Sequence, residues 1–159
     1  MENRQNSTNI NWFPGHMAKT RKQITEDLKL VDVVIEILDA RIPISSQNPE
    51  IKKITQNKKK VVVLNKSDLS DENENKRWME YFIKQGNRVV LVDSNTGKGV
   101  NDVIKQIQIA MAEEMKKLSE KGRIGRKIRV MIVGIPNVGK SSFINRITKK
   151  TSAEVGNKP

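Results

Sequence analysis

Apolar residues recur along the chain in two alternating patterns, short continuous runs and longer segments with helical spacing. The runs cover residues 31–38, 60–64, 88–92 and 128–133. They are rich in β-branched residues, and the first is apolar on both faces, which is typical of strands buried in a parallel sheet. Helical spacing predicts helices over residues 17–29, 49–57, 70–85, 100–118 and 143–147. Strands that alternate with helices predict parallel β-α-β units and an α/β fold.

Turn and cap residues mark the ends of several predicted helices. Asn48 precedes Pro49 and Glu50, which is an N-cap followed by proline at N1 and an acid in the first turn. Ser70 is expected to cap the next helix, and Gly86 is expected to end it at the C′ position.

The two ends of the chain show less regular patterns. Residues 1–11 are expected to form a disordered or extended arm, and Trp12-Phe13-Pro14-Gly15 an anchored turn. The tail over residues 149–159 has no periodicity and is expected to form no element. We therefore divide the chain into an N-terminal arm and turn over residues 1–16 and one domain over residues 17–159.

Composition excludes several classes of protein. The 159 residues suffice for one domain with a core, and there is no cysteine and one histidine. A disulfide framework, a thiolate metal site and a zinc enzyme are therefore disfavoured. The polar first residues give no signal peptide, and no apolar run is long enough to span a membrane. A cytoplasmic protein without a membrane partner is the simplest interpretation.

The net charge of +12 and the pI near 10.0 suggest a polyanionic partner. Nucleic acid is one interpretation, and a solvated lysine-rich surface is the other. The predicted helix over residues 17–29 carries cations outside its apolar face, and it either touches RNA or is a solvated face. The cations are Lys19, Arg21, Lys22 and Lys29.

The stretch from Gly134 to Ser142 fits the phosphate-binding pattern G-x-x-x-x-G-K-[ST] between a predicted strand and a predicted helix. Gly134 and Gly139 are expected to take up backbone conformations that a Cβ would forbid. Backbone N–H groups and the helix dipole would then attract phosphate. Lys140 would reach the β and γ phosphates, and Ser141 would be a Mg²⁺ ligand. The residues expected to hold the phosphates are Asn137, Val138, Gly139, Lys140, Ser141 and Ser142. The alternative is a strand–helix turn without a ligand.

Asn65-Lys66-Ser67-Asp68 fits the guanine-specificity pattern N-K-x-D at the end of a predicted buried strand. The Asp68 carboxylate could accept from the N1–H and the exocyclic amine of guanine, and adenine lacks both donors at that edge. The Lys66 stem could cover the base while its ammonium stays solvated. Ser94 and Asn95 would form a second base-contacting loop. The alternative for the motif is a strand-end turn with a charged pair.

Asp39 and Arg41 follow the first predicted strand, at the position where α/β proteins place ligands. They form either part of a ligand site or a capping ion pair, and the sequence favours neither.

The order of these motifs is unusual for a GTPase, because N-K-x-D precedes the phosphate loop. The chain resembles the circularly permuted GTPases, and in particular the bacterial ribosome biogenesis GTPase A (YlqF-type) family. The resemblance rests on this order and on three stretches, and it extends from Trp12 to Pro159. The stretches are residues 12–17 (WFPGHM), 39–43 (DARIP) and 136–142 (PNVGKSS).

The resemblance implies a Ras-like fold in permuted order, with a mostly parallel sheet flanked by helices. It implies hydrolysis of GTP to GDP and phosphate with Mg²⁺, and a role in late assembly of the large ribosomal subunit through its rRNA; no DNA partner is expected. Lys140 would neutralise charge during the reaction. Members lack the usual catalytic glutamine, and by family position His16 is a candidate to orient the attacking water. Its alternative role is that of a packed turn residue.

The family pattern continues beyond Pro159, and no D-x-x-G motif follows the phosphate loop. By this resemblance the fold is incomplete at its C-terminal end, so we expect the chain to retain GDP binding and to hydrolyse GTP poorly. We also expect residues 130–133 to form an exposed sheet edge that promotes aggregation or dimerisation. A rival function is a non-hydrolysing RNA-binding module with a structural nucleotide, whose affinity residues 17–29 and 119–129 would supply. A generic P-loop ATPase leaves N-K-x-D unexplained.

Overall fold

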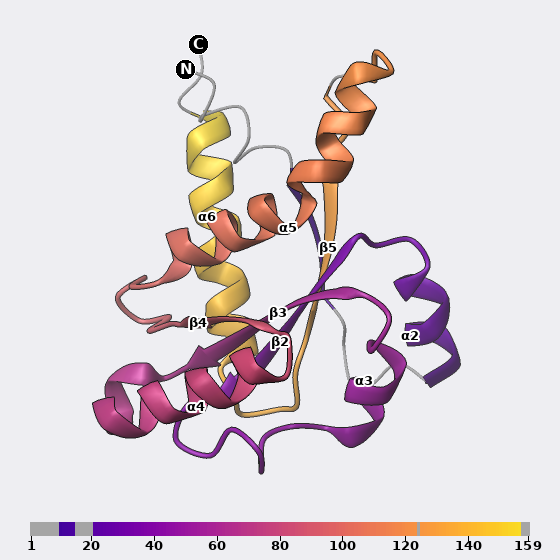
Figure 1. Cartoon of the computed structure of the whole chain (residues 1–159). Helices are drawn as coiled ribbons and strands as arrows, with labels where there is room; N and C mark the ends of the chain where they lie inside the picture. Colours follow the sequence, from indigo (N-terminus) through magenta and orange to yellow (C-terminus); the bar gives the residue numbers. More distant parts are fainter. Residues whose placement is uncertain (1–9, 15–20, 124, 157–159) are drawn as a thin grey trace.

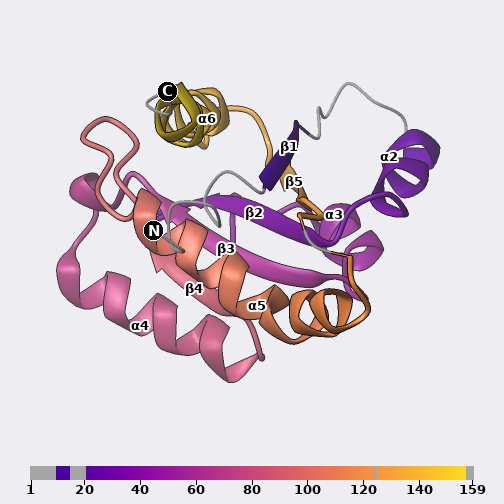
Figure 2. The same cartoon turned by 90° about the horizontal axis from the view of Figure 1, so that it is seen from above.

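A parallel five-stranded sheet forms the centre of the computed structural model, which describes residues 10–14, 21–123 and 125–156. Its spatial order is β1-β5-β2-β3-β4, and every adjacent pair is parallel (Figures 1 and 2). This confirms the predicted α/β fold. The strands are β1 (Ile10–Pro14), β2 (Val33–Asp39), β3 (Lys59–Asn65), β4 (Arg88–Leu91) and β5 (Ile128–Val133).

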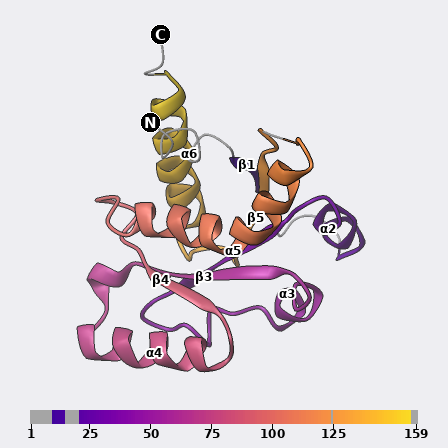
Figure 3. The same cartoon turned by 45° about the horizontal axis from the view of Figure 1, so that its top comes forward.

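Helices cover both faces of the sheet. Helices α5 and α6 lie on one face of the sheet (Figure 3). Helices α2, α3 and α4 lie on the other face. No helix in the described part of the chain is both long enough and apolar enough to cross a membrane. The helical segments are α2 (Arg21–Leu28), α3 (Pro49–Ile54), the 3₁₀ turn η1 (Ser67–Leu69), α4 (Glu72–Lys84), α5 (Val100–Glu120) and α6 (Lys140–Gly156).

Strand β2 shows why the sheet must be covered on both sides. Its successive side chains point to opposite faces, and all seven residues are buried. Val33 and Ile35 pack in the cluster under α5 and α6, whereas Val34 packs with Ile24 and Leu28 of α2. The prediction of a strand that is buried on both faces is confirmed here.

Strand β1 corrects the expectation of an exposed edge at residues 130–133. Ile10 to Pro14 pair in parallel with Ile128 to Ile132, so β5 is an interior strand between β1 and β2. The indole N–H of Trp12 donates to the Thr151 hydroxyl at 3.3 Å, which ties β1 to α6. The expected exposed edge at β5 was therefore wrong, and the reason is that the extended N-terminal segment covers it.

The helix ends confirm two cap predictions, overturn a third and correct the prediction for the C-terminal tail. Asn48 accepts from the backbone N–H groups of Glu50 and Ile51, and Gly86 follows α4 with a φ of +87°. Ser70 is not the N-cap of α4, since Asp71 occupies that position. The tail expected to form no element is also corrected, because α6 continues to Gly156.

An ion pair lies buried on the face of the sheet that α3 and α4 cover. Glu36 of β2 is 2% exposed, and its carboxylate accepts from the Lys60 ammonium at 3.4 Å. The Lys60 side chain is 11% exposed. No local sequence pattern indicates this pair, because the two residues belong to different strands and Glu36 interrupts an apolar run. A buried carboxylate needs such a partner, since desolvation without one is costly.

We expect Lys60→Met to lower the free energy of unfolding by about 3 kcal/mol, because it leaves Glu36 buried without a cation. The double variant Glu36→Leu/Lys60→Met removes both charges and should lie within about 1 kcal/mol of the parent chain. Urea denaturation at neutral pH measures both values. An equal loss in the two variants would show that the charge pairing does not explain the stability.

Candidate functional site

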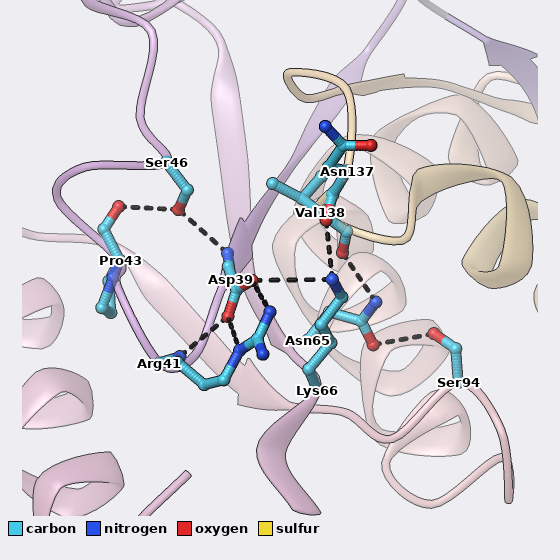
Figure 4. Close-up of polar contacts among 9 residues, drawn as sticks. All are labelled: Asp39, Arg41, Pro43, Ser46, Asn65, Lys66, Ser94, Asn137 and Val138. Carbon is cyan, nitrogen blue, oxygen red and sulfur yellow. Dashed lines mark hydrogen bonds and ion pairs between the residues drawn. The ribbon is translucent and has the colours of Figure 1, made fainter. Parts of the chain in front are cut away.

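Four loops meet at the carboxyl edge of the sheet, where strands β2, β3, β4 and β5 end. The polar side chains that these loops supply contact one another rather than standing separately (Figure 4). The parallel arrangement causes this, because the carboxyl ends of all the strands lie at the same edge.

The loop between β5 and α6 has the backbone geometry of a phosphate loop. Gly139 has a φ of +85°, and an added Cβ there would collide with the Asn65 side-chain amide. Asn137 also has a positive φ, 74°. Gly134 differs from the expectation, because its φ is not in the left-handed region. A Cβ on Gly134 is disfavoured by space instead, since it would lie 3.0 Å from the Ile37 carbonyl oxygen.

Lys140 and Ser141 open helix α6, where backbone N–H groups point out of the helix end. Lys140 is half-buried, and this burial lowers the pKa of its ammonium. A phosphate beside it would favour the charged form and oppose that shift. Ser141 and Ser142 are exposed in the same first turn, so their hydroxyls are accessible to a ligand.

The Asn65 side chain joins the N-K-x-D segment to two other loops. It is 2% exposed, and its amide N–H donates to the Val138 carbonyl at 2.9 Å. Its carbonyl oxygen accepts from the Ser94 hydroxyl at 2.8 Å. Asn65 therefore positions the phosphate loop and the 93–99 loop relative to each other (Figure 4).

The Lys66 ammonium was predicted to stay solvated, but in the structure it contacts two protein groups. It donates to the Asn137 carbonyl at 2.7 Å and lies 3.6 Å from the Asp39 carboxylate. Lys66 has a φ of 62°, which turns the chain sharply out of β3. The N-K-x-D segment is thus attached to the phosphate loop through both Asn65 and Lys66.

Asp39 and Arg41 form the ion pair that was one of their two interpretations. The Asp39 carboxylate accepts from the Arg41 side chain at 2.8 Å and 3.0 Å and from its backbone N–H at 2.9 Å. These bonds, the side-chain ones first, hold the pKa of the Asp39 carboxyl below its ordinary value. The pair is more than a cap, because the same carboxylate also contacts Lys66.

The loop after β4 is ordered by one aspartate and one arginine that the sequence analysis did not single out. The Asp93 carboxylate accepts from the Asn95 backbone N–H at 3.0 Å and from the Thr96 hydroxyl at 3.0 Å. The Arg146 side chain, from α6, donates to the Ser94 carbonyl at 3.0 Å and also to the Asn95 carbonyl. The Asp93 turn has a local signal, a D-x-x-T spacing, whereas nothing near Arg146 in the sequence indicates its partner.

One small cavity of about 100 Å³ lies where these segments meet. Asp68 lines it and is exposed, so its carboxylate is accessible from solvent. The predicted base-binding residues and part of the phosphate loop share this cavity. The lining residues are Asn65, Lys66, Asp68, Leu69, Asp93, Ser94, Asn95, Gly139 and Ser142.

Other predicted contributors lie away from this cavity or outside the described residues. His16, the candidate for orienting water, and Lys19 lie outside the described residues. Within the described ranges, no three acidic or histidine side chains gather as a metal site. In the basic segment over residues 119–129, Arg126 contacts Asp32 at 2.8 Å. That arginine is therefore partly neutralised rather than available to RNA.

The chain is similar to known GTPases along most of its length. The family model described as "50S ribosome-binding GTPase" matches residues 129–159. Ribosome biogenesis GTPase A of Bacillus cereus is 47% identical over 94% of this chain and 51% of that protein. The protein of the same name from Bacillus pumilus is 48% identical over 94% of this chain and 53% of that protein. The chain thus spans about half the length of the curated relatives that it matches.

Solved structures support the same relationship. The structure of GNP-bound YlqF from Thermotoga maritima is 35% identical with a TM-score of 0.58, over 80% of this chain and 46% of that chain. A GDP-bound structure of YlqF gives 36% identity and the same TM-score, over 80% of this chain and 48% of that chain.

We expect the stability that Asp39 provides to disappear in acid. Folding lowers the pKa of this carboxyl, so its contribution is present above the unfolded value of about 3.9 and is lost as the pH falls through the folded value. The free energy of unfolding of the parent chain should exceed that of Asp39→Asn by about 1 kcal/mol at pH 6, a modest value because the Arg41 side chain is 45% exposed.

Urea denaturation of both proteins between neutral pH and pH 3 measures this difference. The two stability curves should converge as the pH falls below about 4. Arg41→Gln should reduce the same pH-dependent difference, because Arg41 is the largest cause of the lowered pKa. Parallel curves for parent and variant would contradict the assignment.

Proposed function

We propose that this chain belongs to the ribosome biogenesis GTPase A family and that it is the guanine-nucleotide-binding part of a GTPase switch. The intact protein would hydrolyse GTP to GDP and phosphate and act in late assembly of the large ribosomal subunit. The observation that carries the proposal is the single cavity shared by N-K-x-D, the 93–99 loop and the phosphate loop. These segments are far apart in sequence, yet they line one cavity. A ligand that carries both a base and phosphates would use all three of them.

Guanine recognition is assigned to the exposed end of the N-K-x-D segment. Asp68 would accept from the N1–H and the exocyclic amine of the base, and the 94–95 backbone would donate to its carbonyl. Asn65 acts as a positioning residue, because both ends of its amide already bind protein groups. Lys66 would both contact the base and hold the phosphate loop, since it lines the cavity and its ammonium contacts Asn137.

The phosphate loop would supply charge neutralisation rather than covalent chemistry. Attack of water on the γ phosphorus breaks its bond to the bridging oxygen and leaves GDP, and the negative charge spreads over phosphate oxygens. Lys140 and the N–H groups at the start of α6 would stabilise that charge. Mg²⁺ would be held by Ser141 together with nucleotide oxygens and water, which is the coordination this ion prefers. His16 remains the proposed residue for orienting the water.

The partner proposal follows from charge as well as from family. The motif order, with N-K-x-D before the phosphate loop, supports a circularly permuted GTPase domain over residues 17–159. A net charge of +12 suits binding to ribosomal RNA, and the bacterial ribosome is assembled in the cytoplasm, so we place the protein there.

We expect Asp68→Asn to weaken GDP binding about a hundredfold or more, because the variant cannot accept two hydrogen bonds from guanine. Xanthosine diphosphate has a carbonyl oxygen in place of the exocyclic amine, so the side-chain amide that this substitution introduces could donate to it. The variant should therefore prefer this nucleotide. Calorimetric titration with Mg²⁺ and GDP, ADP or xanthosine diphosphate measures all three affinities.

Asp71→Asn is the matched control, since Asp71 lies three residues further on and makes no side-chain cap bond. It should bind GDP like the parent chain. Binding of ADP as tight as that of GDP by the parent chain would contradict the guanine assignment and favour a generic ATPase.

Arg146→Ala should lower GDP affinity about tenfold by loosening the Ser94–Asn95 loop, because two hydrogen bonds from a charged donor are lost. The effect should be larger on GDP than on inorganic phosphate, since Arg146 supports the base side of the site. Arg77→Ala removes an exposed arginine of α4 and serves as the control. Equal affinities for GDP in all three proteins would refute this positioning role.

A further inference from the structure

We infer that a basic groove at the amino edge of the sheet is a binding site for the phosphate backbone of structured RNA. The groove has a volume of about 690 Å³, and it lies between α3, the starts of β3 and β4, and α5. Figures 1 and 3 show α3 and the turn from α4 into β4 at the same end of the sheet. The inference deepens the proposed function, because it gives the RNA partner a place on the molecule. The groove cations are Lys52, Lys53, Lys58, Lys59, Lys60 and Arg88.

The charge in this groove is only partly compensated by the protein. No acidic residue lines it, and two of its six cations have a carboxylate partner among the described residues. Lys59 pairs with Glu114, and Lys60 pairs with Glu36. Lys58 donates to the Val31 carbonyl, which fixes the ammonium without neutralising it. Four positive charges in the groove are therefore not paired with a carboxylate of the described residues and are available to a polyanion.

Helix ends explain only part of this clustering. Lys52 and Lys53 lie in the last turn of α3, where cations complement the helix dipole. Arg88 begins β4 and donates to the Gln106 side chain at 3.1 Å, and Lys58 precedes β3, so neither serves that helix end. Three segments, the end of α3, the start of β3 and the start of β4, bring cations to one groove, and no single local capping rule requires this.

The other lining residues favour RNA backbone over other anions. Amide side chains complete the lining, and amides can bind phosphate and 2′-hydroxyl oxygens. Among the described residues that line the groove, none is an aromatic on which an unpaired base could stack, and the apolar side chains are Pro49 and Ala110, neither of which is a large group that would insert into a membrane. A recessed basic groove of this kind fits the regular phosphates of an RNA helix, which proteins read mainly by shape. The amides are Gln47, Gln56, Gln85 and Asn87.

The groove is also separate from the candidate nucleotide site. It adjoins the first residues of β3, whereas Asn65 ends the same strand at the opposite edge. Seven residues of strand separate the two edges by about 20 Å. RNA and nucleotide can therefore be bound at the same time, and the loss of one need not abolish the other.

The test is RNA binding by the variant Lys52→Gln/Lys53→Gln/Arg88→Gln, with an RNA duplex of about twenty base pairs as the probe. We expect affinity near 0.1 M salt to fall about tenfold or more, and the slope of log affinity against log salt to fall by about two, because phosphate contacts release counterions. The control Lys76→Gln/Arg77→Gln/Lys105→Gln removes the same numbers of lysines and arginines from α4 and α5. Lys52→Arg/Lys53→Arg keeps the charge and should keep the affinity.

GDP titration of the same proteins separates the two proposals. Unchanged GDP binding with weakened RNA binding supports the groove, whereas absent GDP binding in the parent chain would overturn the proposed function alone. RNA binding by the groove variant equal to that of the control would overturn the groove. The groove proposal would also be overturned if polyglutamate or phosphatidylserine vesicles displaced the labelled RNA duplex as effectively as unlabelled duplex does. The occupant would then be an acidic protein or a membrane surface.

Discussion

The buried side-chain amide of Asn65 is the contact on which the candidate site depends. It donates to the Val138 carbonyl and accepts from the Ser94 hydroxyl, so one residue at the end of β3 fixes the loops that follow β4 and β5. Gly139 is part of the same constraint, because the Asn65 amide fills the space that a Cβ would need. An amide is suited to this position, since it offers a donor and an acceptor without the cost of burying a charge.

The ionic contacts around Asp39 extend this arrangement. Arg41 donates three hydrogen bonds to the Asp39 carboxylate. The Lys66 ammonium lies 3.6 Å from the same carboxylate and donates to the Asn137 carbonyl at 2.7 Å. The residue pattern D-A-R after β2 thus stabilises the position of the N-K-x-D lysine rather than forming a separate site. Because the bonds from Arg41 lower the pKa of the Asp39 carboxyl, its ionisation contributes to folding and connects the stability of the site to pH.

Sequence patterns predicted the parts of the molecule that local rules determine. Apolar runs located four of the five strands, and motif spacing placed N-K-x-D and the phosphate loop at one edge because parallel strands end together. Contacts between distant residues could not be predicted in this way. Strand β1 pairs with a strand more than a hundred residues away, and neither Glu36 nor Arg146 has a neighbour in sequence that indicates its partner. For these, only the tertiary arrangement decides which groups meet.

Strand β3 runs from the basic groove at the amino edge of the sheet to the candidate nucleotide site at the carboxyl edge. It begins with lysines that line the basic groove and ends with the residue that positions the loops of the candidate site. Because β3 is hydrogen-bonded to β2 on one side and β4 on the other, it cannot slide along its axis without breaking both ladders. A rigid strand of this kind keeps the two surfaces at a fixed separation. Any coupling between RNA and nucleotide would therefore have to act through the loops at each edge, not through movement of the sheet.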